Sequence, residues 1–289
     1  MKIALLSCQR WPDVLEKERA FATEFPKLFE VEVVVWDDPS VNWTDYNYLI
    51  FRTIWDYFEF PNEFAEWLDV LKKQNIKTLN PLPIIERNQH KFYLRDLQNQ
   101  GIDIIPTVFL PKNTGLDLSF MKENNWNQAV IKPAVSGGAY LTQLFSQSDI
   151  SDIVSEYASF ALENDLLVQP FMSEIQETGE LSLLFFQGKF SHAIVKKPKN
   201  GDFRVQSQFG GQYHAFEPDT ALLATAQNII DTFGGDLLYA RVDGILKDGQ
   251  FLLMELELIE PDLYFDYHPD AKNNYFAAVE AMVFEKWHK

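Results

Sequence analysis

The 289-residue sequence contains a single cysteine and no long uninterrupted apolar segment. Because Cys8 is alone, an internal disulfide is excluded, which suits a reducing, cytoplasmic location. No run of about 18 apolar residues occurs, so we expect no transmembrane helix. The start, MKIALLSCQRWPD, predicts a first strand rather than a secretory signal, because polar residues follow a short apolar run.

Positive charge is also scarce. The chain has 25 Lys and Arg against 42 Asp and Glu, which gives a net charge of −17. Nucleic-acid binding requires a basic footprint, so this balance speaks against a nucleic-acid partner. The hydrophobic content of 46% and aromatic content of 15% indicate a globular protein, with enough chain for two or three domains.

Two common nucleotide-binding motifs are missing. The sequence contains neither G-x-G-x-x-G nor G-x-x-x-x-G-K-[ST]. The dinucleotide fingerprint and the phosphate-binding P-loop are therefore both excluded. If the chain binds a nucleotide, it must do so through a different binding motif.

Apolar runs and helical spacing alternate through the first part of the chain. We predict strands at residues 2–7, 31–36 and 48–52, and helices at residues 15–29 and 62–73, the second capped by Asn62. This order indicates βαβ units around a mainly parallel sheet. Further along we predict helices at residues 88–100, 148–164, 220–233 and 272–289, strands at 107–110, 129–133 and 166–169, and a hairpin of 181–186 with 189–195.

Loops that follow parallel strands are common ligand sites. Here these are Cys8–Asp13 and Arg52–Tyr57. Arg10, Arg52 and Asp56 are the candidates for holding a small polar substrate. A surface salt bridge with tryptophan packing is the alternative interpretation.

An acidic hairpin stands near the C-terminus, in LLYARVDGILKDGQFLLMELELIEPD. Alternation along the strands places Glu255 and Glu257 on one face, and a three-residue loop centred on Gly249 would set Asp243 opposite Glu255 and Arg241 opposite Glu257. Carboxylates at such short separations repel one another unless a positive charge lies among them. A bound Mg²⁺, which prefers oxygen ligands, is one way to supply this charge. A solvated strand face is the other interpretation.

Two stretches could bind an anion. Lys132 precedes Ser136, Gly137 and Gly138, whose backbone can approach a phosphate closely. Basic residues then gather at Lys196, Lys197, Lys199 and Arg204. An ordinary surface turn and a solvated basic loop remain the alternatives for the two stretches.

Taken in order, these features resemble the ATP-grasp superfamily, particularly its glutathione-synthetase-like and ribosomal-S6-glutamate-ligase-like members. The matches cover residues 88–262: K-x(9)-G-I-x(3)-P, V-I-K-P, V-Q-P-F-M, G-E-L-S, K-K-P, D-F-R-V-Q with a trailing G-G, V-D-G, and E-L-E before Pro261. E-L-E-L-I-E-P also resembles the branch that contains the cycloserine-forming cyclo-ligase.

The resemblance implies an N-terminal Rossmann-like α/β domain, with a parallel sheet, at 1–86. A two-lobed α+β ATP-grasp fold would follow, with a lid lobe at 87–168 and a larger lobe at 169–289. It also implies ATP and Mg²⁺, with Mn²⁺ as a substitute, and a homodimer is common among similar proteins.

The resemblance assigns roles to particular residues. Lys91 and Lys132 would meet the α- and β-phosphates under the loop of Ser136, Gly137 and Gly138. The segment Gln169, Phe171 and Met172 would receive adenine, and Glu180 would bind ribose or the adenine edge, with Glu174 and Glu177 as rivals. Lys196, Arg204 and Arg241 would be catalytic. Asp243, Glu255 and Glu257 would hold the metal, with Glu257 standing where the family usually has Asn. Glu260 departs from the family, in which relatives often have a small residue here, and it would face an amine substrate.

The implied reaction joins a small-molecule carboxylate to an amine at the expense of ATP, through an acyl phosphate. Arg10, Arg52 and Asp56 would supply much of the acceptor site. Two alternatives stay open, an ATP-binding module without ligase turnover and an ATP-grasp phosphotransferase.

Overall fold

The N-terminal part of the molecule is a parallel sheet. The computed structural model describes residues 1–287, and its first sheet has the order β2-β1-β3-β4. The strands are β1 (Lys2–Ser7), β2 (Glu30–Val35), β3 (Tyr48–Thr53) and β4 (Thr78–Leu79). Ile3 and Leu5 face one hydrophobic core while Ala4 and Leu6 face another, so the sheet is covered on both sides. The predicted parallel sheet is confirmed.

The two helices of this unit differ from the prediction at their ends. Helix α1 spans Pro12–Ala22 and α2 spans Pro61–Lys73. Both begin at a proline, whose missing N–H costs nothing in a first helical turn, so Phe60 and not Asn62 is the cap of α2. The apolar spacing beyond Ala22 belongs to turns, in which Phe25 and Phe29 are still buried.

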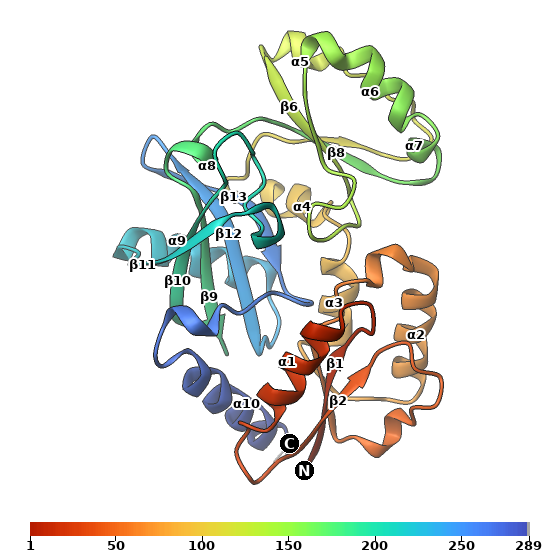
Figure 1. The fold of residues 1–289 in the computed structure, drawn as a ribbon, viewed down its shortest axis with the longest axis vertical. Coiled ribbons are helices and arrows are strands. Elements are labelled where there is room, and N and C mark those ends of the chain that lie inside the picture. The colour runs from red at the N-terminus through yellow and green to blue at the C-terminus, as the bar shows by residue number, and fades with distance from the viewer. Residues whose placement is uncertain (288–289) are drawn as a thin grey trace.

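The middle of the chain forms a small antiparallel sheet with the order β5-β8-β6-β7 (Figure 1). Its strands are β5 (Val108–Leu110), β6 (Gln128–Pro133), β7 (Gln143–Ser146) and β8 (Leu166–Pro170). Helices α5 (Phe120–Glu123), α6 (Ile150–Tyr157) and α7 (Phe160–Glu163) share its core. The predicted helix 148–164 is thus two helices, and both Tyr157 and Phe160 still pack on that core.

A larger antiparallel sheet with the order β11-β10-β9-β12-β13 completes the fold. Its strands are β9 (Glu180–Phe186), β10 (Lys189–Lys197), β11 (Gln212–Phe216), β12 (Tyr239–Lys247) and β13 (Gln250–Glu257). The accompanying helices are α3 (Leu82–Asn88), α4 (Tyr93–Asn99), α8 (Glu174–Glu177), α9 (Thr220–Phe233) and α10 (Ala271–Trp287). Single 3₁₀ turns lie at 43–45, 57–59, 147–149, 207–209 and 265–267.

The helix expected over residues 88–100 is interrupted. Helix α3 ends at Asn88 and α4 begins only at Tyr93, so Lys91 lies between them, where its backbone N–H donates to the carbonyl of Ala134 at 2.8 Å. A tertiary hydrogen bond replaces a helical one, which sequence periodicity does not reveal. The last predicted helix matches α10, with residues 288–289 outside the described part.

The three sheets span residues 2–79, 108–170 and 180–257, and the division at 86 and 168 stays a prediction. Helix α4 packs on the core of the large sheet, where Tyr93 and Leu97 meet Leu181. Helix α10 returns to the N-terminal sheet, where Tyr275 packs with Phe21 (Figure 1). Among residues 1–287, no helix combines the length and apolar character needed to cross a bilayer.

The acidic hairpin has the predicted pairing but reaches it differently. Asp243 pairs with Glu255 and Arg241 with Glu257, as expected. The predicted three-residue loop is wrong, however, because Lys247 pairs with Gln250 across a two-residue turn. Asp248 and Gly249 both have positive φ, at 51° and 80°, as such turns require.

A one-residue bulge restores the register. Gly244 pairs with Leu253 while its neighbour Asp243 pairs with Glu255, which leaves Met254 as the extra residue. A Cβ atom on Gly244 would approach the carbonyl oxygen of Leu252 to 2.4 Å, so glycine is required at this bulge. The bulge therefore sets which carboxylates face one another.

Candidate active site

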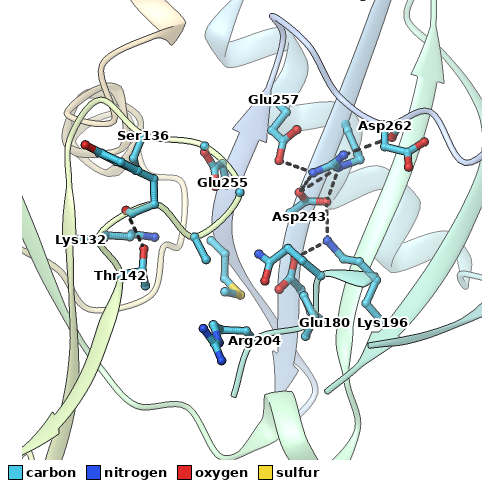
Figure 2. A pocket seen from close by; sticks show the side chains of 18 of the residues that line it. Lys132, Ser136, Thr142, Glu180, Lys196, Arg204, Asp243, Glu255, Glu257 and Asp262 are labelled. Atoms are coloured by element: carbon cyan, nitrogen blue, oxygen red, sulfur yellow. Dashed lines mark hydrogen bonds and ion pairs between the residues drawn. The ribbon is translucent and has the colours of Figure 1, made fainter. Parts of the chain in front are cut away.

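A cavity of about 630 Å³ lies between the sheets, and most of the predicted site residues line it. Figure 2 shows Lys132 and Ser136 on one side, Asp243 and Lys196 on the other, and Glu255 between them. The predicted residues at its wall are Lys91, Lys132, Ser136, Gly137, Gly138, Gln169, Phe171, Met172, Glu180, Lys196, Arg204, Arg241, Asp243, Glu255, Glu257 and Glu260.

Strands of the large sheet place charged side chains in contact. Lys196 on β10 pairs with Glu180 on β9 and lies 3.7 Å from Asp243 on β12. Arg241 donates to Asp243, with Nη2 to Oδ2 at 2.8 Å, and also pairs with Glu257. Lys196, Glu180, Arg241 and Asp243 are buried and Glu257 is partly exposed, so each buried charge has an opposite charge in contact with it.

The pKa values follow from this burial and pairing. Burial alone would raise the pKa of Asp243, but Arg241 and Lys196 hold it below its usual range. Burial likewise opposes ionisation of Glu255, and Lys91 and Lys132 hold the pKa of its carboxyl down. For Glu257 burial wins: with Asp243 and Glu255 nearby, its pKa rises to about 8 despite the attraction of Arg241.

The three carboxylates expected to hold a metal share one patch, but they do not converge on a common point. Within residues 1–287, no group of three His, Cys, Asp or Glu side chains has the arrangement of a metal site. Arg241 lies between Asp243 and Glu257, and Lys91 pairs with Glu255 at 3.0 Å. The positive groups among the carboxylates are thus side chains of the chain itself.

The donor set nevertheless fits a hard cation. Glu255 and Glu257 are both on β13, at alternating positions that line the cavity, and both offer carboxylate oxygens. Glu257 carries a raised pKa, which a bound cation would bring down. The metal ligands stay a prediction.

The opposite side is built from the small sheet and the loop after β6. Lys132 ends this strand, and burial beside Lys91 lowers its pKa against the pull of Glu255. Lys91 Nζ donates to the carbonyl of Ser136, which ties the loop to the lysine. The backbone of this loop has positive φ at Gly138, Ala139 and Leu141.

The expected adenine segment also lies at the wall. Gln169 is buried and donates from Nε2 to Thr107 Oγ1 at 2.9 Å. The backbone N–H of Phe171 donates to the carbonyl of Gln128 at 3.0 Å, so this amide already has a partner. Of the three acids considered beside it, Glu180 lines the cavity.

Its two rivals are placed elsewhere. Glu174 and Glu177 belong to the short helix α8 and are not at the cavity wall, and Glu174 pairs with Lys247 at 3.2 Å. Arg204 does reach the wall, where it pairs with Asp202 at 2.9 Å and stacks 3.6 Å from the centre of the Phe209 ring.

The N-terminal candidates are not where the sequence suggested. Arg52 is buried away from the cavity, paired with Glu18 at 3.0 Å and packed against the rings of Phe21, Phe265 and Tyr275. Asp56 is buried too and accepts a hydrogen bond from Trp36 Nε1 at 2.9 Å. Arg10 pairs with Glu59. None of these three side chains is at the cavity wall, and their role in holding a substrate stays a prediction.

The loops that carry them are the right ones, however. They contribute Trp11, Trp55 and Tyr57 to the wall, together with Phe58 and Glu59. The sequence signal was the aromatic character of CQRWPD and RTIWDYFE after two parallel strands. Tyr213, Tyr264, Phe203 and Asp262 also line the cavity and were not anticipated.

Known proteins resemble both the sequence and this architecture. Residues 3–80 match the family model for the N-terminal domain of D-cycloserine synthetase DcsG. The chain is 28% identical over 254 residues to the cycloserine biosynthesis protein DcsG of Streptomyces lavendulae, a match that covers 83% of this chain and 84% of that protein.

Solved structures agree in fold. The crystal structure of D-cycloserine synthetase DcsG has a TM-score of 0.81 at 24% identity, over 96% of this chain and 98% of that one. D-alanine–D-alanine ligase from Bacillus anthracis, complexed with ATP, has a TM-score of 0.71 at 15% identity, over 98% and 96%. The ATP-grasp ligase PsnB, complexed with a minimal precursor, Mg and ADP, has a TM-score of 0.61 at 13% identity, over 96% and 97%.

The predicted fold class is confirmed by these structures. The expected resemblance to the cycloserine-forming branch is confirmed as well. The chain is thus similar in sequence to a cycloserine biosynthesis protein, and it shares its fold with D-cycloserine synthetase DcsG and with D-alanine–D-alanine ligase.

Proposed function

We propose that this chain joins a small-molecule carboxylate to an amine at the expense of ATP, through an acyl phosphate. The observation that carries the proposal is the cavity itself. One cavity is lined by five cationic side chains and by the carboxylates of β12 and β13, which is the charge pattern that a metal-bound triphosphate requires (Figure 2). The cations are Lys91, Lys132, Lys196, Arg204 and Arg241.

In this proposal the nucleotide lies between the small and large sheets. Lys91 and Lys132 bind the α- and β-phosphates, and the loop of Ser136, Gly137 and Gly138 covers them. Adenine lies against Gln169, Phe171 and Met172, and Glu180 binds its edge or the ribose. The backbone carbonyl of Phe171 accepts a hydrogen bond from adenine, because the backbone N–H of Phe171 already donates to Gln128.

Glu255 and Glu257 would hold Mg²⁺ or Mn²⁺, with Asp243 beside them. When bound, the metal supplies charge that neutralises the phosphate oxygens. For this to happen the existing ion pairs must exchange partners, so that Lys91 and Arg241 turn from the carboxylates towards phosphate oxygens.

The chemistry requires two displacements. An oxygen of the substrate carboxylate attacks the γ-phosphorus, and the bond to the β-phosphate oxygen breaks to release ADP. The neutral amine nitrogen then attacks the carbonyl carbon of the acyl phosphate, and the bond from that carbon to the phosphate oxygen breaks. Inorganic phosphate leaves and takes up the proton that the nitrogen loses as the amide forms. Lys196, Arg204 and Arg241 neutralise the transferring phosphoryl group.

No side chain needs to act as a covalent nucleophile. Cys8, the single thiol, is 1% exposed, and burial raises its pKa to about 11. A thiol with such a pKa is inert at neutral pH. Positioning and charge neutralisation therefore carry the proposed catalysis.

The test is ADP release with Mg·ATP across a panel of amino acids and small amines, followed by mass spectrometry of the products. We expect ADP release that requires both Mg²⁺ and a matching acid and amine, with an amide as product. ATP binding without ADP release from any pair would indicate a binding module. A phosphorylated product without an amide would indicate a phosphotransferase. Either result contradicts the proposal.

A further inference from the structure

The cavity has a second end, which is built by the loops of the N-terminal sheet. These loops contribute Trp11, Val14, Trp55, Tyr57, Phe58 and Glu59 to the wall. Every lining cation, in contrast, comes from residues 91–241. The N-terminal end therefore offers aromatic faces and negative charge, and among its lining residues there is no lysine or arginine to receive a carboxylate.

Glu260 stands out among the lining carboxylates. Glu59, Glu180, Asp243, Glu255 and Glu257 each have an ion-pair partner. Within residues 1–287 the structure gives none to Glu260, although it is only partly exposed and lies at the cavity wall. Asp262 also lacks an ion pair, but it is exposed and accepts a hydrogen bond from the Tyr264 N–H at 3.0 Å.

The backbone that carries Glu260 is firmly held. Trp55 Nε1 donates to the Glu260 carbonyl at 2.9 Å, and the Tyr239 hydroxyl donates to the carbonyl of Ile259 at 2.8 Å. Arg241 Nη1 donates to the carbonyl of Asp262 at 3.1 Å. These bonds tie the segment to the N-terminal loop and to β12, so the carboxylate is presented from a fixed support.

Aromatic rings complete this end. Trp55 lies edge-on to Trp11 with ring centres 6.3 Å apart, and the guanidinium of Arg10 already covers Trp11 at 5.2 Å. The Trp55 ring remains for a ligand, whereas the Tyr57 ring packs against Phe64 with ring centres 4.6 Å apart. An ammonium group is attracted both to an aromatic face and to a carboxylate. Burial raises the pKa of the Tyr57 hydroxyl well above its usual value, and the charge of Glu260 is the next cause, which indicates that the two side chains are close.

We propose that Glu260, supported by Trp55, binds a protonated amino group of the substrate. The proposal rests on the proposed ligase function and specifies its substrate class: a compound that enters the N-terminal end of the cavity by its ammonium group and not by a carboxylate. Burial, together with Glu257 and Glu255, raises the pKa of Glu260, and a bound cation would lower it again.

The test compares ethylammonium with propionate, two small ions that carry the same ethyl group and opposite charges. Binding to the full chain is measured by ligand-observed NMR in the presence of Mg·ADP. We expect saturable ethylammonium binding that is weakened at least about tenfold in Glu260→Gln, as loss of a charged hydrogen bond predicts. Asp262→Asn, with the same change of charge at the same cavity, should alter the dissociation constant less than about twofold.

Equal ethylammonium binding in wild type and Glu260→Gln would overturn the proposal, as would its absence in wild type. An equal loss in Asp262→Asn would attribute the effect to overall charge and overturn it too. Each variant must retain wild-type Mg·ADP affinity, and Trp55→Phe, which removes the bond to the Glu260 carbonyl, gives a second variant with an expected loss of a few fold. Failure of the ligase function would instead appear as the absence of any amide, with ethylammonium binding unchanged.

Discussion

The two walls of the cavity carry charge in opposite ways. On the wall of β9, β10, β12 and β13, cations and carboxylates contact one another, as Lys196 does with Glu180 and Arg241 with Asp243. On the N-terminal wall, aromatic rings surround carboxylates, and Glu260 has no ion-pair partner within residues 1–287. The paired wall can exchange partners when phosphate and metal enter, whereas Glu260 on the aromatic wall has no cation beside it in the described part of the chain until a substrate brings one.

The largest effect should come from the paired wall, at Glu255. In Glu255→Gln the amide can neither neutralise Lys91 nor bind a cation as a carboxylate does. We expect kcat for Mg·ATP-dependent ADP release to fall about 1000-fold, with the far-UV circular dichroism unchanged. Glu123→Gln, the same substitution at an exposed position of α5, should behave as wild type. If Glu255→Gln kept wild-type turnover, Glu255 would not be a residue of the active site.

Arg52 should separate stability from binding. Arg52→Met leaves Glu18 buried without its partner, and we expect the free energy of unfolding to fall by about 4 kcal/mol in urea denaturation. Because Arg52 lies behind the cavity, KM values of the folded enzyme should stay unchanged. Arg19→Met removes an exposed pair and should cost less than about 1 kcal/mol. If Arg52→Met instead raised the KM and left the free energy of unfolding unchanged, Arg52 would be a substrate-binding residue after all.

His192 supports the chain just beyond the aromatic wall. Its Nε2 donates to the carbonyl of Leu263 at 3.0 Å, and burial, with His268 nearby, lowers its pKa from 6.5 to about 4. Between these values the unfolded chain binds a proton that the folded chain does not, so stability present above pH 6.5 is lost as pH falls.

We expect this contribution to reach roughly 3 kcal/mol between pH 7 and pH 4. Urea unfolding across this range should show a shallower acid loss in His192→Asn than in wild type. His214→Asn, at an exposed position of β11, should keep the wild-type slope. Parallel profiles for wild type and His192→Asn would contradict the assignment.

The smallest effect concerns the contact between the loop after β6 and the aromatic N-terminal wall. A Cβ atom on Gly137 would lie 2.7 Å from the Phe58 ring, so the loop after β6 packs directly on the N-terminal unit. Phe58 also contacts Tyr140, with ring centres 5.3 Å apart. We expect Gly137→Ala to raise the KM for ATP a few fold, about 1 kcal/mol, by forcing this contact apart. Adding Phe58→Ala should restore it, and additive effects of the two substitutions would argue against the contact.

The paired wall was the more predictable one. Alternation along a strand depends on local sequence, so Asp243, Glu255 and Glu257 could be placed on one face and Arg241 among them. The bulge at Gly244 was missed, yet it compensates for the shorter turn, so the predicted pairing is confirmed.

The aromatic wall was less predictable because its geometry depends on distant partners. Arg52 looked available, but its partner Glu18 is 34 residues away and its cover includes Phe265 and Tyr275. Likewise, the break at Lys91 is fixed by Ala134, far along the chain. The two loops do line the cavity, as expected, and their tryptophans Trp11 and Trp55 were the residues that pointed to it.

One measurement addresses the account most directly: a structure of the chain with Mg²⁺ and a non-hydrolysable ATP analogue. We expect the triphosphate to lie against Lys91, Lys132 and Lys196, with the metal on Glu255 and Glu257 and the Arg241–Glu257 pair loosened. A nucleotide bound elsewhere, or phosphates that leave the ion pairs of β12 and β13 intact with no metal on β13, would contradict it.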